Sequence, residues 1–130
     1  MSNAVLYDGT RCIGCRACSV ACKSWNQNPD DPEGKVSVEG GIQGKAVLSD
    51  KTFTFMRFRE VGEGDDFRWA FAKIQCMHCL HPACEGACPV GALKRDEETG
   101  AVVYDDSRCF GCRYCMVACP FGVPTFQWDE

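Results

Sequence analysis

A membrane-spanning helix needs about eighteen or more apolar residues in a row, and the chain has no apolar run of nearly that length. Its first residues, Met1–Tyr7, show no basic stretch followed by an apolar run, so no secretory signal is visible. With a net charge of −4, it also lacks the basic footprint of a nucleic-acid-binding domain. A glycine-rich phosphate loop, a flavin or nicotinamide fingerprint and a general-base constellation are missing too. These absences predict a chain with no direct membrane span, no nucleic-acid partner and no catalysis of its own.

Ordinary apolar side chains are scarce as well, because the hydrophobic share of 45% includes twelve cysteines. A chain of 130 residues is one domain, or a small domain with an insertion. Its conventional core is predicted to be thin. A cofactor that fixes several loops at once would replace the missing packing, so we expect the fold to collapse without it.

What the chain has in quantity is cysteine, arranged in three groups of four. The groups are Cys12, Cys15, Cys18, Cys22; then Cys76, Cys79, Cys84, Cys88; then Cys109, Cys112, Cys115, Cys119. The first and third share the spacing C-x2-C-x2-C-x3-C of bacterial ferredoxins. Four thiolates suit a [4Fe–4S] cubane, with one for each iron. The sequence therefore predicts a carrier of iron–sulfur clusters, and so of electrons.

Two other interpretations of these cysteines are weaker. A secreted disulfide scaffold would also be rich in cysteine, but such frameworks rarely repeat one close spacing. Four thiolates can also bind a structural zinc ion. Zinc ribbons, however, usually separate their cysteine pairs by about fifteen or more residues, whereas each group here is compact.

The fourth cysteine of a group, where proline follows it, binds the other cluster in two-cluster ferredoxins. Both Cys88 and Cys119 precede a proline. The predicted ligands of cluster A are therefore Cys76, Cys79, Cys84 and Cys119. Those of cluster B are Cys109, Cys112, Cys115 and Cys88.

The first group differs, because Cys22 is followed by Lys23 rather than proline. Cys12, Cys15 and Cys18 are predicted to bind a cluster C, whose fourth ligand stays open. The fourth ligand is either Cys22 itself or a cysteine of a motif outside this chain. The third alternative is an open cubane that has only three protein ligands. Two clusters, A and B, are thus expected, together with a third, cluster C.

An internal repeat relates the first and third groups. Cys12–Cys22 and Cys109–Cys119 agree at eight of eleven positions, including a glycine and an arginine between the cysteines. We divide the chain into residues 1–27, which hold the first motif, 28–69, a loop and β-hairpin insertion, and 70–130, a two-cluster module. In both repeats, the segment that follows the second cysteine is predicted to form a short helix against a cluster.

Two hairpins are predicted from the polarity pattern. Alternation over 53–60, a loop at 62–66 and a returning strand at 67–75 form the first. Short strands at 92–95 and 101–104, joined by a turn that ends at Gly100, form the second. Residues 28–34 and 39–41 carry turn and loop signals. The predicted fold class is α+β: a ferredoxin-like two-[4Fe–4S] module with an additional N-terminal cluster motif and an inserted β-hairpin.

Four polar residues adjoin the ligands without a clear part in binding. His78 and His81 flank Cys79, and we interpret them as surface groups or neighbours of a cluster. Arg16 and Arg113 either offset cluster charge or are simply solvated, and the sequence does not decide.

These motifs resemble those of a known family. Tyr7-Asp8 followed by Arg11–Asn26, then Gln75–Leu93 and Cys109–Pro124, are similar to the iron–sulfur electron-transfer subunits of molybdopterin oxidoreductases, and most of all to formate dehydrogenase beta subunits. The resemblance implies four motifs and four cubanes in two ferredoxin-like units, with motif two paired to three and motif one to four. This sequence ends before a fourth motif, so we expect a truncated or short form.

The resemblance also implies partners. Such subunits relay single electrons from a molybdenum or tungsten pterin catalytic subunit to a membrane cytochrome or quinone-reactive subunit, or to a soluble acceptor. The expected location is the cytoplasm, with membrane association through a partner, or export in a folded state with a signal-bearing partner. The alternatives are a free-standing soluble polyferredoxin, an oxygen or redox sensor with a labile first cluster, and a structural zinc module.

Overall fold

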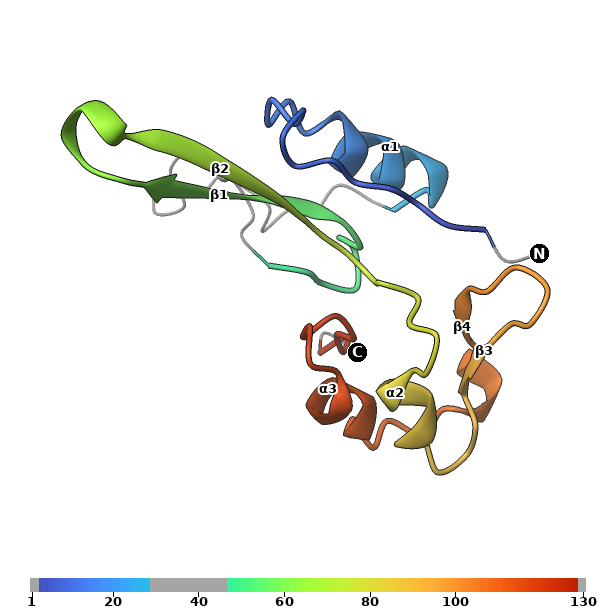
Figure 1. The fold of residues 1–130 in the computed structure, drawn as a ribbon. Coiled ribbons are helices and arrows are strands. Elements are labelled where there is room, and N and C mark those ends of the chain that lie inside the picture. Colours follow the sequence, from blue (N-terminus) through green and yellow to red (C-terminus); the bar gives the residue numbers. More distant parts are fainter. Residues whose placement is uncertain (1–2, 29–46, 129–130) are drawn as a thin grey trace. The chain divides into compact units, whose positions relative to one another are not determined.

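The computed structural model describes residues 3–28 and 47–128, and it divides the chain into two compact units (Figure 1). One unit is Tyr7–Gln75, and the other combines Met1–Leu6 with Cys76–Glu130. The domain boundaries predicted at 27/28 and 69/70 stay a prediction. Most of the predicted loop over residues 28–41 lies outside the described residues.

In the unit Tyr7–Gln75, the first cysteine motif leads into helix α1, Ala17–Trp25. The helix predicted after Cys15 is therefore confirmed. It ends at Asn26, where the backbone N–H and the side-chain amide both donate to the Cys22 carbonyl. These two hydrogen bonds satisfy one of the carbonyls that a helix end leaves without a partner. Helix α1 contacts strand β1, Phe55–Val61. This contact joins the first cysteine motif to the hairpin that β1 begins.

The first predicted hairpin is confirmed, with strand ends shifted by one or two residues. Strand β1 pairs antiparallel with β2, Arg68–Ile74, so that Phe58 stands opposite Phe71. A 3-10 turn, η2, spans Gly64–Asp66 at the tip. Gly62 has a φ of +82°, and a Cβ there would lie 2.4 Å from the Asp66 carbonyl oxygen, so the turn requires glycine.

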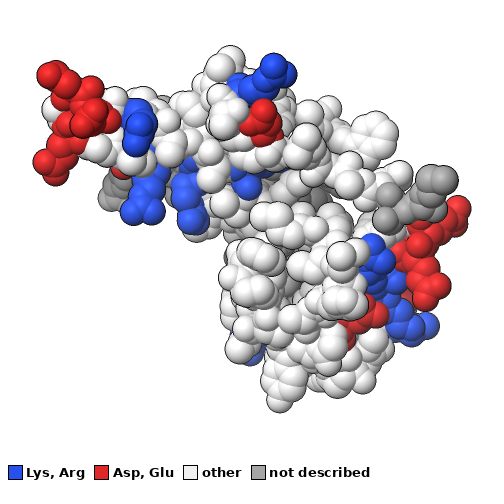
Figure 2. Space-filling model, viewed as in Figure 1, with Lys and Arg blue, Asp and Glu red and all other residues white. Residues whose placement is uncertain are grey.

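Four aromatic rings follow one another along the hairpin, each edge to face with the next. The rings of Phe67 and Trp69 are 5.8 Å apart, those of Trp69 and Phe58 6.3 Å, and those of Phe58 and Phe71 5.2 Å. Such pairs contribute about 0.5–1.5 kcal/mol each beyond their buried area. Acidic side chains gather at the tip, at Glu63, Asp65 and Asp66 (Figure 2).

The unit of Met1–Leu6 and Cys76–Glu130 consists of short elements. They are α2, Ala83–Gly86; β3, Leu93–Arg95; β4, Val102–Tyr104; the 3-10 turn η3, Asp106–Arg108; and α3, Tyr114–Ala118. Strands β3 and β4 pair antiparallel, and the turn between them ends at Gly100 with a φ of +77°. The second hairpin, its glycine and the helix after Cys112 are thus confirmed.

The core is thin, as the composition predicts. Among the described residues, the buried apolar side chains are those of Phe55, Met56, Phe58 and Ala92, and three of them belong to β1. Helices of four, five and nine residues are too short to be stable by themselves. In the described part of the chain, none is long and apolar enough to cross a bilayer. The mixed helix and strand content agrees with the predicted α+β class.

Candidate metal centres

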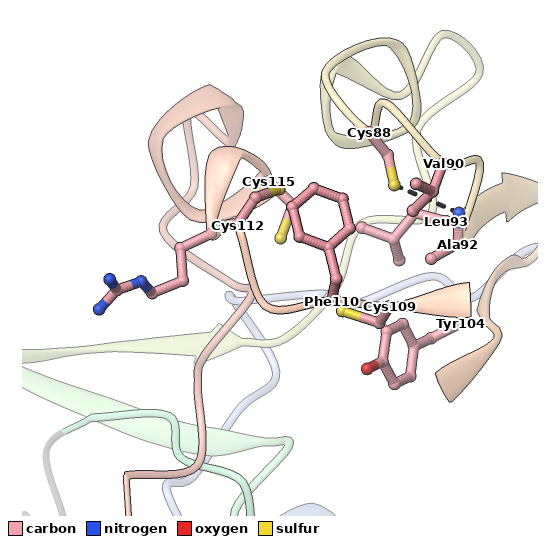
Figure 3. A pocket seen from close by; sticks show the side chains of 10 residues that line it. Cys88, Val90, Ala92, Leu93, Tyr104, Cys109, Phe110, Cys112 and Cys115 are labelled. Carbon is pink, nitrogen blue, oxygen red and sulfur yellow. Dashed lines mark hydrogen bonds between the residues drawn. The ribbon is translucent and has the colours of Figure 1, made fainter. Parts of the chain in front are cut away.

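Four thiols from two motifs line one cavity (Figure 3). Cys109, Cys112 and Cys115 come from the third motif, and Cys88 comes from the second. The rest of the wall is mostly apolar and consists of Val90, Ala92, Leu93, Tyr104, Phe110 and Arg113. Within the described residues, no three histidine, cysteine or acidic side chains converge as ligands of a single ion do. The cavity lined by the four thiols suits a cofactor with several metal atoms, such as an iron–sulfur cluster.

Cys88 follows helix α2, and the chain then turns back over its sulfur. The Ala92 N–H donates to the Cys88 Sγ at 3.2 Å, and the Gly91 N–H donates to the Cys88 carbonyl. Backbone N–H groups, that of Leu93 most strongly, hold the pKa of the Cys88 thiol below its ordinary value. Because the thiolate is the form that binds metal, this turn prepares Cys88 as a ligand.

Cys115 of the third motif has a raised pKa instead. Burial raises the pKa of Cys115, and the neighbouring Cys112 and Cys109 thiolates raise it further. Both causes disfavour the charged form, so Cys115 favours the protonated thiol when no metal is bound. A cationic metal core would remove the repulsion between the thiolates, and its binding would then release protons.

A second group of thiols also draws on two motifs. The pKa of Cys76 is raised by burial and then by the charges of Cys79 and Cys119, while that of Cys84 is raised by burial and then by Cys119 and Cys76. Cys119, from the third motif, therefore lies among the thiols of the second. The four residues predicted to bind cluster A are neighbours in the structure.

The fourth cysteines of the second and third motifs, Cys88 and Cys119, each begin a backbone turn of the same kind. The Gly91 N–H donates to the Cys88 carbonyl at 3.3 Å, and the Gly122 N–H donates to the Cys119 carbonyl at 3.2 Å. Both glycines have a φ of +61°. The repeated Cys-Pro-x-Gly sequence thus encodes a repeated turn, in which the proline fixes one φ and the glycine supplies the positive one.

His78 occupies a position that is glycine in the other two motifs. Its φ is +44°, and its N–H donates to the Cys76 Sγ at 3.4 Å. Its Nδ1 accepts a hydrogen bond from the Val102 N–H of β4 at 2.9 Å. The side chain therefore ties the second motif to the hairpin. Sequence reasoning missed this role, although the alignment of His78 with Gly14 and Gly111 was available.

In the first motif, the Gly14 N–H donates to the Cys12 Sγ at 3.4 Å. Cys12 and Cys18 both lie near Tyr7, whose pKa is raised by burial and then by these two cysteines. Cys22 lies in the last turns of α1, where the Asn26 side-chain amide donates to its sulfur at 3.6 Å. All twelve cysteines are in the described part of the chain, and all are free thiols there.

The internal repeat extends five residues upstream of the first cysteine. Asp8 accepts hydrogen bonds from the backbone and hydroxyl of Thr10 at 2.9 and 2.6 Å, and Asp105 accepts them from Ser107 at 3.1 and 2.6 Å. A tyrosine precedes each aspartate. Sequence reasoning began the repeat at the cysteine and missed these turns, whose signal is the pattern Tyr-Asp-x-Ser/Thr-Arg-Cys.

A glycine and an arginine of each repeat pack against aromatic rings. A Cβ at Gly14 would lie 2.9 Å from the Phe71 ring and 3.0 Å from the Phe58 ring, and the Arg16 guanidinium stands 4.9 Å from the Phe58 centroid. The third motif repeats this arrangement with rings from the C-terminal segment.

A Cβ at Gly111 would lie 3.3 Å from the Phe126 ring. The Arg113 guanidinium stands 5.6 Å from the Phe126 centroid and 5.0 Å from that of Trp128. Each arginine therefore stacks on an aromatic ring, a contact that neither interpretation from the sequence included.

Comparison with known proteins gives two matches to families described as 4Fe-4S dicluster domains. One covers residues 67–130 and the other residues 11–92, so they overlap on the second cysteine group. Together with the twelve cysteines, they support [4Fe–4S] clusters, two or more, as the cofactors. The ferredoxin-like part of the predicted fold agrees with these matches.

Three curated relatives are named after a hydrogenase or a formate dehydrogenase. The Hydrogenase-2 operon protein HybA of Escherichia coli O157:H7 is 40% identical over 99% of this chain. The formate dehydrogenase-O iron-sulfur subunit of Escherichia coli (strain K12) is 40% identical over 98%, and the formate dehydrogenase iron-sulfur subunit of Haemophilus influenzae is 39% identical over 98%. The chain spans about 40% of the length of these relatives.

Proposed function

We propose that this chain, which belongs to the 4Fe-4S dicluster domain family, relays single electrons within an oxidoreductase complex and carries out no substrate chemistry. The observation that carries the proposal is the exchange of cysteines between two motifs. Cys88 of the second motif lines the cavity of the third, and Cys119 of the third lies among the thiols of the second.

The ligand sets follow from that exchange. We assign Cys76, Cys79, Cys84 and Cys119 to cluster A, and Cys109, Cys112, Cys115 and Cys88 to cluster B. Cys12, Cys15 and Cys18 are assigned to cluster C, with the fourth ligand open between Cys22 and a cysteine of another motif. Bound clusters would supply one-electron oxidation and reduction at each site.

Short helices keep sites A and B close together. Helix α2 holds Cys84, a ligand of site A, and Cys88 of site B follows it four residues later. Helix α3 holds Cys115 of site B, followed by Cys119 of site A. The same two short segments therefore each supply one ligand to site A and one to site B, which keeps the two sites adjacent. This proximity favours fast electron transfer between them.

The protein environment adjusts the sites for this work. Backbone N–H groups donate to Cys76 and Cys88 sulfurs, which stabilises the extra negative charge of a reduced cluster. The side chains of Val90, Leu93 and Phe110 form an apolar wall that limits water at site B. Hydrogen bonding and burial are the two means by which a protein sets the potential of such a centre.

For the partner, we propose a molybdenum or tungsten pterin catalytic subunit of the formate dehydrogenase type, with a membrane cytochrome or a soluble acceptor after it. Relatives named as formate dehydrogenase iron-sulfur subunits support this assignment. A relative named after a hydrogenase operon supports a hydrogenase as a second candidate. A free-standing polyferredoxin, which meets its partners only transiently, is the remaining alternative.

Two measurements test these proposals. Iron, acid-labile sulfide and zinc are first counted per chain after anaerobic purification. About eight irons with equal sulfide are expected if sites A and B are loaded, and about twelve if site C is loaded too. Zinc without sulfide would overturn the electron-transfer proposal.

The partner is then identified by affinity purification from the native host. Formate or hydrogen is added to the complex, and the bleaching of cluster absorbance is followed in time. Reduction by formate is expected. Reduction by hydrogen alone would replace the pterin partner with a hydrogenase, and a chain that purifies alone would favour the free polyferredoxin.

A further inference from the structure

The backbone N–H of Val102 points away from the partner strand of its hairpin. The Asp96 N–H donates to the Ala101 carbonyl at 2.7 Å, so these two residues form a bonded position of the β3–β4 pair. Val102 follows Ala101 and stands opposite Arg95. Bonded and non-bonded positions alternate in an antiparallel pair, so the Val102 N–H faces the open edge of this two-stranded sheet. There it needs an acceptor from outside the hairpin.

That acceptor is the imidazole of His78. Its Nδ1 accepts the Val102 N–H at 2.9 Å, from a residue twenty-four positions away in the chain. Because Nδ1 accepts, the proton of the neutral imidazole lies on Nε2. His78 is exposed, so without this bond its side chain could occupy several rotamers. The bond therefore fixes the loop of the second cysteine motif to the edge of the hairpin.

The backbone of His78 directs a second donor at a predicted cluster ligand. The His78 N–H donates to the Cys76 Sγ at 3.4 Å, and the φ of His78 is +44°. At the equivalent position of the first motif, the Gly14 N–H donates to the Cys12 Sγ at 3.4 Å with a φ of +69°. Glycine adopts a positive φ freely, whereas a residue with a Cβ does so at a cost. The second motif thus forms the same loop with a residue that needs support, and the bond to Val102 supplies it.

We propose that His78 is a positioning residue: its imidazole, anchored on the Val102 N–H, holds the His78 N–H on the Cys76 sulfur and thereby raises the reduction potential of cluster A. The proposal rests on the ligand set proposed above for cluster A. Reduction adds negative charge to the cluster and its thiolates. A donor that is fixed on a thiolate therefore stabilises the reduced state more than the oxidised state.

The first test compares two substitutions of His78 that both tolerate a positive φ. His78→Gly removes the acceptor. His78→Asn keeps one, because the Oδ1 of asparagine occupies the same place along the side chain as the Nδ1 of histidine. Iron and sulfide are counted, potentials are measured by redox titration with electron paramagnetic resonance, and exchange of the Val102 N–H is followed by mass spectrometry. The signal that Cys84→Ala alters identifies cluster A.

For His78→Gly we expect full iron content, loss of exchange protection at Val102 and a fall in the potential of cluster A. For His78→Asn we expect the protection and the potential to lie close to the wild-type values. Equal falls in the two variants would mean that the acceptor is not what matters. A fully loaded His78→Gly protein with unchanged potentials would mean that the N–H stays on Cys76 without the side chain. Either result would overturn the proposal.

The second test removes the donor and leaves the cysteine motif untouched. Val102→Pro deletes the N–H, and proline is tolerated where the N–H of an edge strand points outward. We expect the potential of cluster A to fall as it does in His78→Gly. Because both changes break the same bond, the double variant should fall no further than either single variant. A loaded Val102→Pro protein with unchanged potentials would contradict the proposal, even where His78→Gly loses iron.

The matched control is His81→Gly, which removes the other imidazole that flanks Cys79 and leaves the bond between His78 and Val102 in place. We expect the potentials and the protection of the Val102 N–H to stay at their wild-type values. A fall equal to that of His78→Gly would mean that any change in this loop lowers the potential, and would overturn the specific role of His78. A wild-type chain without iron and sulfide would instead contradict the proposed function, so the two failures are distinguishable.

Discussion

The first and third cysteine motifs have nearly the same local structure but different surroundings. Gly14 and Gly111 have φ values of +69° and +78°, and Arg16 and Arg113 have values of +62° and +64°. Each arginine directly precedes a helix, α1 or α3. The repeated residues thus set the loop conformation by themselves, whatever packs around it.

What differs is the source of the supporting groups. The first motif rests on Phe58 and Phe71 of the β1–β2 hairpin, and the third rests on Phe126 of the C-terminal segment. The third motif shares its cavity with Cys88. The comparison teaches that a loop can be encoded locally, whereas the four-thiol cavity at the third motif takes its fourth cysteine from the second motif.

The largest expected effect comes from removing the exchanged ligand. Cys88→Ala leaves site B with three thiols, and we expect the loss of about four irons per chain. The matched control is Cys22→Ala, which removes the fourth cysteine of the first motif and should leave sites A and B loaded. Iron and sulfide analysis with electron paramagnetic resonance measures both. A Cys88→Ala protein that retains the wild-type iron content would contradict the exchange.

The two loop glycines should differ in their tolerance of a methyl group. Both have positive φ, so alanine costs about 1–2 kcal/mol at either position. At Gly14 the new Cβ would also press on two rings at 2.9 and 3.0 Å, which adds about 1–3 kcal/mol. At Gly111 the nearest ring is 3.3 Å away and belongs to one residue, Phe126.

We therefore expect Gly14→Ala to lower the denaturant midpoint of the holoprotein more than Gly111→Ala under anaerobic conditions. Equal losses would mean that φ alone determines the cost and that the Phe58 and Phe71 rings move aside freely.

How much the sequence could predict follows the same division between local and distant causes. The hairpins were predictable because their strands and turns lie close together in the chain, as with Asp96–Gly100. A proline after each predicted that Cys88 lies beside the third motif and Cys119 beside the second. The ring contacts were not predictable, since the two motifs take their rings from unrelated segments and no repeated pattern marks Phe58 and Phe126 as equivalent.

The two stacked arginines should differ in how much they stabilise the fold, because they contact different numbers of rings. Among the described residues, Arg113 lies over two rings and Arg16 over one, and each such contact contributes about 0.5–1 kcal/mol at an exposed site. We expect Arg113→Gln to lower the anaerobic denaturant midpoint more than Arg16→Gln. The lysine variant at each position, which keeps the charge, should lie between glutamine and the wild type. A larger loss at Arg16 would show that the hairpin, rather than the ring count, determines the cost.

The smallest effect is expected at the repeated aspartate turns. Hydrogen bonds from Thr10 lower the pKa of Asp8, and hydrogen bonds from Ser107 lower that of Asp105 from the ordinary value of 3.8. Asp105 also pairs with Arg108, whose Nε lies 3.0 Å from its carboxylate. A carboxyl with a lowered folded-state pKa stabilises the fold above its unfolded-state pKa, and that contribution is lost as the pH falls through the folded-state value. Both contributions are therefore complete at neutral pH and disappear only below about pH 4.

Thr10→Ala and Ser107→Ala remove the main donors, so each should raise the pKa of its aspartate towards 3.8. Because Arg108 still faces Asp105 in Ser107→Ala, the pKa of Asp105 should stay further below 3.8 than that of Asp8 in Thr10→Ala. Isotope-edited infrared titration of the aspartate carboxyls measures both. If the two variants give the same pKa, the ion pair with Arg108 adds nothing, and the two turns are equivalent in energy as well as in form.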